Sequence, residues 1–142
     1  LGHFNTSLVA AEQVTDDPTA IAASYLRLQQ AGAEVILIGG SIVLDPGDPF
    51  LQAVELLEGE IVCRGAPIDP GTMFWVARVG SGILLGLASC EMYGRLSVLD
   101  LILPFALARE AITPELFAEL GYGGLLEQTY RARNIFPKTT GE

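Results

Sequence analysis

The sequence is poor in the residues that most often carry catalysis or hold metal ions. It has one histidine, His3, and two cysteines, Cys63 and Cys90, which do not stand at a metal-binding or redox spacing. Histidine-based catalysis and zinc sites need partner residues at characteristic spacings, so we expect neither here. Cys63 alternates with apolar neighbours and is expected in the core. Two cysteines without a recognisable secretory signal predict a reduced, cytoplasmic protein.

Positive charge is also scarce. Lys138 is the only lysine, and 8 basic residues face 17 acidic ones, which gives a net charge of −9 at pH 7. Proteins that bind nucleic acid or anionic membrane surfaces need clustered cations, so we predict neither partner. The longest apolar stretch, 96–107, contains Asp100 and Pro104 and is shorter than the roughly 20 residues that span a membrane.

What the chain does have is apolar patterning. Half of its 142 residues are hydrophobic (50%), which suits one domain with a real core. We expect that domain over 1–128 and a loose polar tail over 129–142. The elements expected are strands at 7–14, 34–38, 60–64, 72–79 and 83–87, and helices between Pro18 and Gly32 and at 49–57, 96–110 and 114–120. The alternation predicts an α/β fold with a mostly parallel sheet, in which 72–87 forms one antiparallel hairpin.

The most informative stretch is the apolar strand that runs into Gly39-Gly40-Ser41. Glycines at the carboxyl end of a buried strand let the backbone turn sharply and approach a ligand closely. Asp48-Pro49 then has the pattern of a helix cap followed by the first helical residue. We predict that Gly40 has a positive φ or lies at a ligand site.

Acidic and basic side chains cluster in loops near strand ends. Asp45, Asp48 and Asp69 fit turn and cap chemistry, but one of them could also bind a divalent cation. Three arginines, Arg64, Arg78 and Arg95, could converge on a phosphate, and Arg95 is expected at the start of the long helix. The alternative for Arg95 is a solvated or interface position.

Several of these features follow one another in a fixed order along residues 8–126. The order is a strand into Gly39-Gly40-Ser41, an acidic loop to Asp48, a helix, a strand into 67–71, a hairpin into 86–90, a long helix with Pro104, and Gly-Gly-Leu-Leu at 123–126. This order resembles the molybdopterin-binding domain of molybdenum-cofactor biosynthesis proteins, which occurs in molybdopterin adenylyltransferases and molybdotransferases. The resemblance implies a three-layer α/β sandwich with a mostly parallel, doubly wound sheet.

The resemblance also implies site residues. The family's glycine-rich loop falls on Gly39, Gly40 and Ser41, and its acidic position falls on Asp48, the implied catalytic and Mg²⁺-side carboxylate. Phosphate would be held by 39–41 and 87–90, with the pterin in the crevice between these loops. The implied cofactor-binding residues are Gly39, Gly40, Ser41, Asp69, Pro70, Gly71, Ser89, Cys90 and Arg95.

The chain departs from the family pattern at residues that would contact phosphate. Ile42 stands in place of a glycine, Thr72 in place of a lysine, and Ala88, Ser89 and Cys90 in place of proline, glycine and asparagine. Isoleucine resists a positive φ and blocks close backbone approach, and loss of the lysine removes a cation. We therefore expect binding of molybdopterin or molybdenum cofactor without strong intrinsic catalysis, where active relatives perform adenylyl transfer or metal insertion with Mg²⁺.

Two other functions stay open. A degenerate, non-catalytic oligomerisation or partner-binding module would fit if Ile42 and Met92 filled the crevice. A generic nucleotide-binding α/β domain comes third, because the chain has neither GxGxxG nor a P-loop. A short, half-apolar chain is expected to leave apolar surface for a homo-oligomer, and relatives of the domain favour a trimer. The family's first strand and helix are expected to be missing from this chain.

Overall fold

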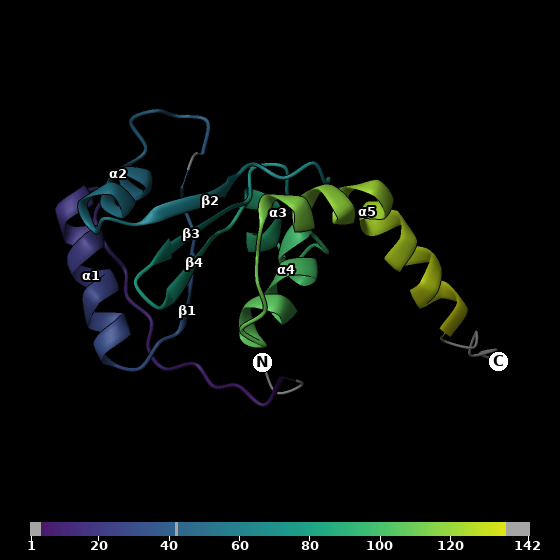
Figure 1. Cartoon of the computed structure of the whole chain (residues 1–142), viewed down its shortest axis with the longest axis horizontal. Helices are drawn as coiled ribbons and strands as arrows, with labels where there is room; N and C mark the ends of the chain where they lie inside the picture. The colour runs from purple at the N-terminus through teal and green to yellow at the C-terminus, as the bar shows by residue number, and fades with distance from the viewer. Residues whose placement is uncertain (1–3, 42, 136–142) are drawn as a thin grey trace.

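The computed structural model describes residues 4–41 and 43–135, which form a mixed α/β fold (Figure 1). The elements in chain order are α1 (Pro18–Gln30), β1 (Val35–Ile38), α2 (Pro49–Leu56), β2 (Glu60–Arg64), β3 (Trp75–Val79), β4 (Gly82–Gly86), α3 (Ser89–Met92), α4 (Val98–Leu107) and α5 (Pro114–Ile135). None of these helices is both long and apolar enough to cross a membrane.

The four strands form one open sheet in the order β1-β4-β3-β2. Only β1 and β4 are parallel, whereas β4 with β3 and β3 with β2 are antiparallel. The prediction of a mostly parallel sheet is therefore wrong for the described residues. A parallel pair needs a crossover connection, and no helix lies between Arg64 and Trp75 to provide one. The predicted hairpin turn at 80–82 is confirmed, because β4 starts at Gly82.

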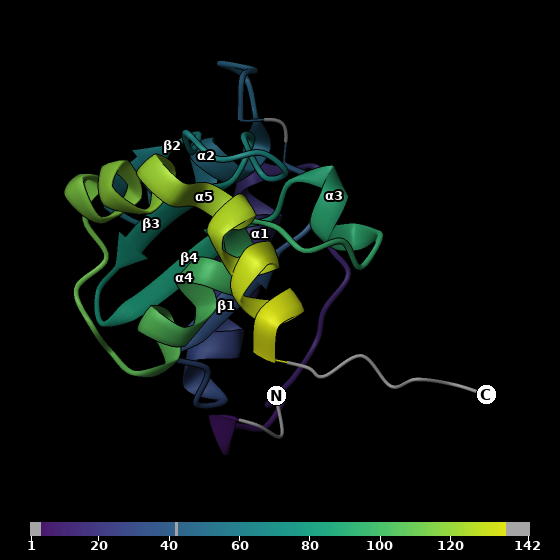
Figure 2. The ribbon, with the colours of Figure 1, turned by 90° about the vertical axis from the view of Figure 1, so that its right-hand side faces the viewer.

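Helices cover both faces of the sheet, and a separate apolar cluster lies under each face. Alternation along β3 divides its side chains, so that Trp75 and Ala77 belong to the cluster with α1 and α2, while Val76 belongs to the cluster with α4 and α5. Figures 1 and 2 show α1 and α2 on one side of the strands and α4 and α5 on the other.

Two helix starts follow the predicted cap chemistry. Asp17 accepts a hydrogen bond from the Ala20 amide at 2.7 Å, and Pro18 is the first residue of α1. Asp48 caps α2 in the same way, with Pro49 as the first helical residue. Both caps satisfy amide groups that an α-helix cannot bond internally.

The two ends of the chain differ from expectation. Residues 7–14 form no strand, because no described strand pairs with them, and Leu8 is 72% exposed. At the other end, the predicted turn at 121–124 and loose chain from 129 are wrong up to Ile135, since α5 runs through both. A glycine inside a helix is about 1 kcal/mol less favourable than an alanine, and a helix can tolerate this cost. Gly121 also packs closely on Pro67, where a Cβ would lie 2.9 Å from the ring. The rest of the predicted tail, 136–142, lies outside the described residues.

Candidate functional site

Three of the loops predicted to bind a cofactor lie at the same end of the sheet. The carboxyl ends of the parallel strands β1 and β4 are neighbours, because Ile38 pairs with Gly86 and its carbonyl accepts from the Leu87 amide at 2.8 Å. Loops 39–41 and 87–90 therefore leave the sheet side by side. Trp75 pairs with both Gly86 and Arg64, so the loop that joins β2 to β3, which holds 69–71, is at this end too.

Gly40 has the backbone conformation that the sequence predicted. Its φ is +101°, a region that residues with a Cβ rarely adopt, and nothing lies within 4 Å of the position a Cβ would take. Gly39 and Gly40 are both exposed. The backbone of this loop is accordingly open to approach from solvent.

Ser41 and Asp48 are joined by a hydrogen-bond network that includes Trp75. The indole Nε1 of Trp75 donates to Ser41 Oγ at 2.9 Å, and that hydroxyl donates to Asp48 Oδ2 at 3.0 Å. Asp48 Oδ1 accepts from the amides of Phe50 at 2.9 Å and Leu51 at 3.1 Å. The network ties the loop after β1 to the start of α2 and to the central strand β3.

Asp48 is thus a buried cap, with only 2% of its surface exposed. Asp45 makes a turn, since its side chain accepts from the Gly47 amide at 2.8 Å. The turn-and-cap interpretation of these two residues is confirmed. Among the described residues, no group of three or more His, Cys, Asp or Glu side chains could hold a metal ion. The Mg²⁺ role of Asp48 stays a prediction.

The loop with Asp69, Pro70 and Gly71 is held against the start of α4. The Val98 amide donates to the Pro70 carbonyl at 3.2 Å, and a Cβ on Gly71 would lie 2.6 Å from the Val98 side chain. Asp69 itself is exposed, and the Thr72 hydroxyl contacts its carboxylate at 3.5 Å. Only glycine at 71, with φ +118°, permits this close packing.

In the third segment, 87–90, Ser89 and Cys90 begin the short helix α3, where the sequence predicted a loop. Ser89 is exposed, whereas Cys90 is partly buried and its thiol lies 3.6 Å from Glu91 Oε2. Burial, followed by the charge of Glu91, raises the pKa of the Cys90 thiol above its ordinary value. The thiol is therefore a poor nucleophile at neutral pH.

The three arginines do not converge on one phosphate site. Glu60 pairs with Arg78 and Trp75 with Arg64, so the two arginines stand at opposite ends of the β2–β3 ladder. Arg64 donates to the Val43 carbonyl at 2.8 Å, and Arg78 donates to the Ile112 carbonyl at 2.5 Å. Arg95 is exposed and precedes α4, which starts at Val98 behind a capping box of Ser97 and Asp100. The prediction that Arg95 begins the long helix is wrong, because the capping box places the first helical residue at Val98, three residues later.

One feature of this region was missed in the sequence. Trp75 is buried with its indole lying across Gly86, where a Cβ would come within 1.8 Å of Nε1. A single tryptophan in an apolar strand was itself a signal, because a buried indole needs a hydrogen-bond acceptor. The structure describes neither the side chain of Met92 nor the position of Ile42. The expectation that these two residues fill the crevice therefore stays a prediction.

In a comparison with known proteins, no family model matches the chain and no curated protein matches it either.

Proposed function

We propose that this chain binds a phosphorylated pterin, either molybdopterin or the molybdenum cofactor, at the end of the sheet where residues 39–41, 69–71 and 87–90 lie. The observation that supports this function most is the meeting of these loops, which are far apart in sequence. An open backbone at Gly40 supports it further, because phosphate is commonly held by unobstructed amide groups.

The proposal includes the finer architecture and setting. We take the helix–sheet–helix arrangement as a version of the three-layer, doubly wound sandwich in which one strand, β3, runs antiparallel to both of its neighbours. We place the protein in the cytoplasm, where its two free cysteines would stay reduced. Neither nucleic acid nor a membrane surface is proposed as a partner, given the net charge of −9.

We propose further that intrinsic catalysis is weak. Phosphoryl and adenylyl transfer need cations and donors aimed at developing charge, and loss of one such group can cost about 10²–10³ in rate. Asp48 is occupied as a buried helix cap, and Arg64 is bonded to a carbonyl. A pterin with one phosphate requires less charge neutralisation than ATP does.

The test uses two glycines that are matched in geometry. Gly40 (φ +101°) and Gly32 (φ +98°) both have open space where a Cβ would lie. Alanine at either position should cost a similar amount of stability, about 1–3 kcal/mol. Gly32 follows α1 and lies outside the proposed loops. Protein made in a host that synthesises the cofactor should release a fluorescent oxidised pterin, and Gly40→Ala but not Gly32→Ala should abolish this release.

Absence of pterin from the folded wild-type protein would contradict the proposal. Equal pterin content in both variants would show that the loop at Gly40 is an ordinary turn.

An assay with ATP, Mg²⁺ and molybdopterin tests the proposal that intrinsic catalysis is weak. Robust turnover that is lost in Asp48→Asn would overturn the non-catalytic part.

A second function, a partner-binding or oligomerisation module, is favoured by a different observation. Loops at the same end of the sheet expose Leu44 (68%), Met73 (42%), Tyr93 (81%) and Leu96 (46%). Exposed apolar side chains that gather at one end are typical of interfaces. We expect light scattering to give three times the 15.1 kDa of one chain. The double variant Leu44→Ser/Tyr93→Ser should lower that mass, whereas Leu8→Ser should not. A mass of one chain at micromolar concentration would exclude self-association.

A further inference from the structure

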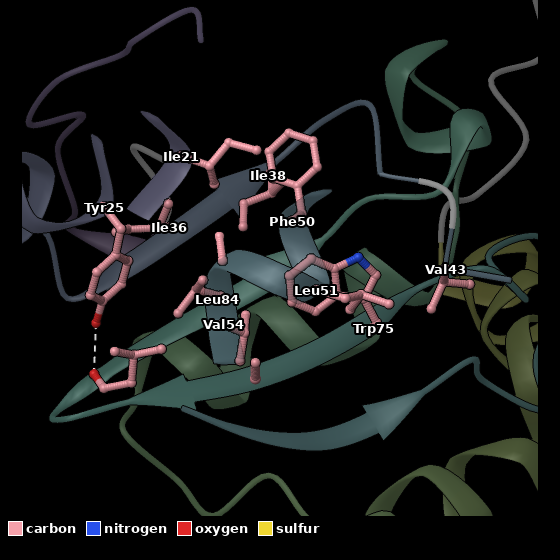
Figure 3. Packing of buried hydrophobic residues seen from close by; sticks show 13 residues of the cluster. Ile21, Tyr25, Ile36, Ile38, Val43, Phe50, Leu51, Val54, Trp75 and Leu84 are labelled. Atoms are coloured by element: carbon pink, nitrogen blue, oxygen red, sulfur yellow. Dashed lines mark hydrogen bonds between the residues drawn. The ribbon is translucent and has the colours of Figure 1, made fainter. Parts of the chain in front are cut away.

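A cavity of about 330 Å³ lies on the α1/α2 face of the sheet, beside β1. Its walls are mainly apolar and come from four elements: Ile21, Tyr25 and Leu28 of α1, Ile36 and Ile38 of β1, Phe50 and Val54 of α2, and Leu84 of β4. Figure 3 shows Ile21, Ile38 and Phe50 close together, and Tyr25 turned away to bond the Val79 carbonyl. The tyrosine hydroxyl is therefore already satisfied.

The chain before α1 forms the remaining wall. Residues Glu12, Gln13, Val14 and Asp16 line the cavity, although they belong to no helix or strand. Glu12 fastens this strap (residues 12–16) to α1. Its two carboxylate oxygens accept from Arg27 at 3.2 and 2.5 Å, and the Ser24 hydroxyl donates to the same group at 2.8 Å. A bidentate arginine pair is a specific way to hold an otherwise exposed segment in place.

From this arrangement we infer that the cavity is a binding site for a small aromatic molecule of about two fused rings that is neutral or carries one positive charge. The inner wall of the cavity is made of buried side chains, whereas its outer edge is formed by exposed residues of the strap, so a ligand can reach it from solvent. An apolar cavity of about 150 Å³ holds benzene, which sets the scale for the ligand. Volume and lining also fall within the ordinary range for small-molecule sites.

The sign of the ligand's charge follows from the mouth of the cavity. Glu12 and Asp16 both line the cavity, and within the part of the chain that the structure describes only Glu12 of these two forms an ion pair, with Arg27. Because Arg27 offsets the charge of Glu12, the remaining negative charge beside the cavity is that of Asp16. An anionic ligand would be repelled, and a neutral or cationic one would be accepted.

The cavity is a different site from the proposed pterin site, although the two share Gly39 and Gly40. The walls on α1 and α2 belong to the cavity alone, so variants of these helices change the cavity without changing residues 39–41. Failure of naphthalene binding and failure of pterin binding can therefore be told apart.

The experiment uses three naphthalenes that share a ring system and differ in charge. These are 2-naphthol, 2-(aminomethyl)naphthalene and 2-naphthoate, followed by ligand fluorescence and calorimetry with the whole chain. We expect saturable binding of the first two at one molecule per chain and at least tenfold weaker binding of the carboxylate. A carboxylate that binds as tightly as the amine would overturn the assignment of charge.

Paired variants on α1 locate the site. Leu28→Phe fills part of the cavity, whereas Leu26→Phe makes the same change at a position that is 45% exposed and does not line it. The dissociation constant should rise at least tenfold in Leu28→Phe and stay unchanged in Leu26→Phe. Ala53→Met, another lining residue, is the second filling variant if Leu28→Phe fails to fold.

Variants of the strap test its role in ligand exchange. Glu12→Gln should raise the ligand dissociation rate at least fivefold, whereas Glu34→Gln, which loosens the exposed pair with Arg109, should leave the rate unchanged. The inference is overturned if no naphthalene binds saturably, or if the filling variants and Leu26→Phe behave alike. The inference is also overturned if the protein without ligand is a dimer and only the cavity-filling variants are monomers. In that case part of a second copy of the chain, and not a small molecule, would occupy the cavity.

Discussion

The two faces of the sheet bury similar amounts of apolar side chain but differ in chemistry. On the α4/α5 side, Phe74, Leu85, Ile102 and Ile112 are all 0% exposed, and the cluster is made of plain hydrophobic groups. On the α1/α2 side the core also holds the Trp75 indole N–H, bonded to Ser41. That side borders the cavity as well.

This difference indicates that the two faces of the sheet have different roles in the fold. An apolar, fully enclosed cluster stabilises the fold through burial of surface and close packing. A face that encloses polar groups must satisfy each of them, which fixes the loops that carry the partners. The α1/α2 face therefore positions loops and leaves space, and the α4/α5 face supplies stability.

Gly86→Ala should be among the most destabilising substitutions. A Cβ at this position would meet Trp75 Nε1 at 1.8 Å, and the buried indole has no room to move. We expect a loss of about 3 kcal/mol or more in the free energy of unfolding, measured in urea. Gly47→Ala is the control, since its Cβ would meet only an Asp45 oxygen at 3.3 Å. Trp75→Phe should recover part of the loss in the double variant. Two single variants of equal stability would contradict the packing of Trp75 on Gly86.

Truncation of one phenylalanine on each face tests the comparison directly. Phe74 is fully buried on the α4/α5 side, and Phe50 borders the cavity with 8% of its surface exposed. Phe74→Ala should cost about 3–5 kcal/mol. Phe50→Ala should cost at least about 1 kcal/mol less, because fewer neighbours surround its ring. Both are read from denaturant unfolding, and a larger cost for Phe50→Ala would refute the division between faces.

Two helix caps of the same sequence pattern provide a smaller effect. Asp17 and Asp48 each precede a proline at the start of a helix, but only Asp48 is buried and bonded to Ser41. Asp17→Ala should cost about 1 kcal/mol, as exposed caps do. Asp48→Ala should cost about 2–3 kcal/mol, because it also leaves the Ser41 hydroxyl and two buried amides without an acceptor. Thermal unfolding of both variants side by side decides this, and equal costs would mean that the network contributes nothing.

The caps also show what local sequence can predict. The Asp-Pro pairs at Asp17 and Asp48, which precede apolar residues at helical spacing, start helices, whereas those at Asp45 and Asp69, each followed by glycine, lie in turns and loops. These helix starts and the hairpin turn at Gly80–Gly82 were therefore predictable. The pairing of β2 with β3 was not, because it depends on whether a helix forms in residues 65–74. The same holds at the site. The φ of Gly40 follows from its place in a turn, whereas the contact of Trp75 with Ser41 joins residues 34 apart along the chain.

The smallest expected effect is a pH-dependent release of the strap. Hydrogen bonds from Arg27 and Ser24 lower the pKa of Glu12 below 4.5, its ordinary value. Because the folded-state pKa is lowered, the contact is complete above pH 4.5 and is lost as pH falls through the folded value. An NMR titration should show residues 12–16 shifting in this acid range. Glu12→Gln should remove the shift, and Glu34→Gln should not. A midpoint at or above 4.5 for Glu12 would contradict the hydrogen bonds from Arg27 and Ser24 to its carboxylate.

The packing of Trp75 has a consequence for spectroscopy. It is the only tryptophan in the chain, so all indole emission comes from one fully buried ring whose N–H is bonded to Ser41 in the loop after β1. Its emission should be blue-shifted and poorly quenched by acrylamide in the folded protein. Any molecule that displaces the Ser41 hydroxyl from the indole N–H would change the fluorescence intensity of Trp75. The fluorescence of the unlabelled protein therefore reports on the loop that holds Ser41.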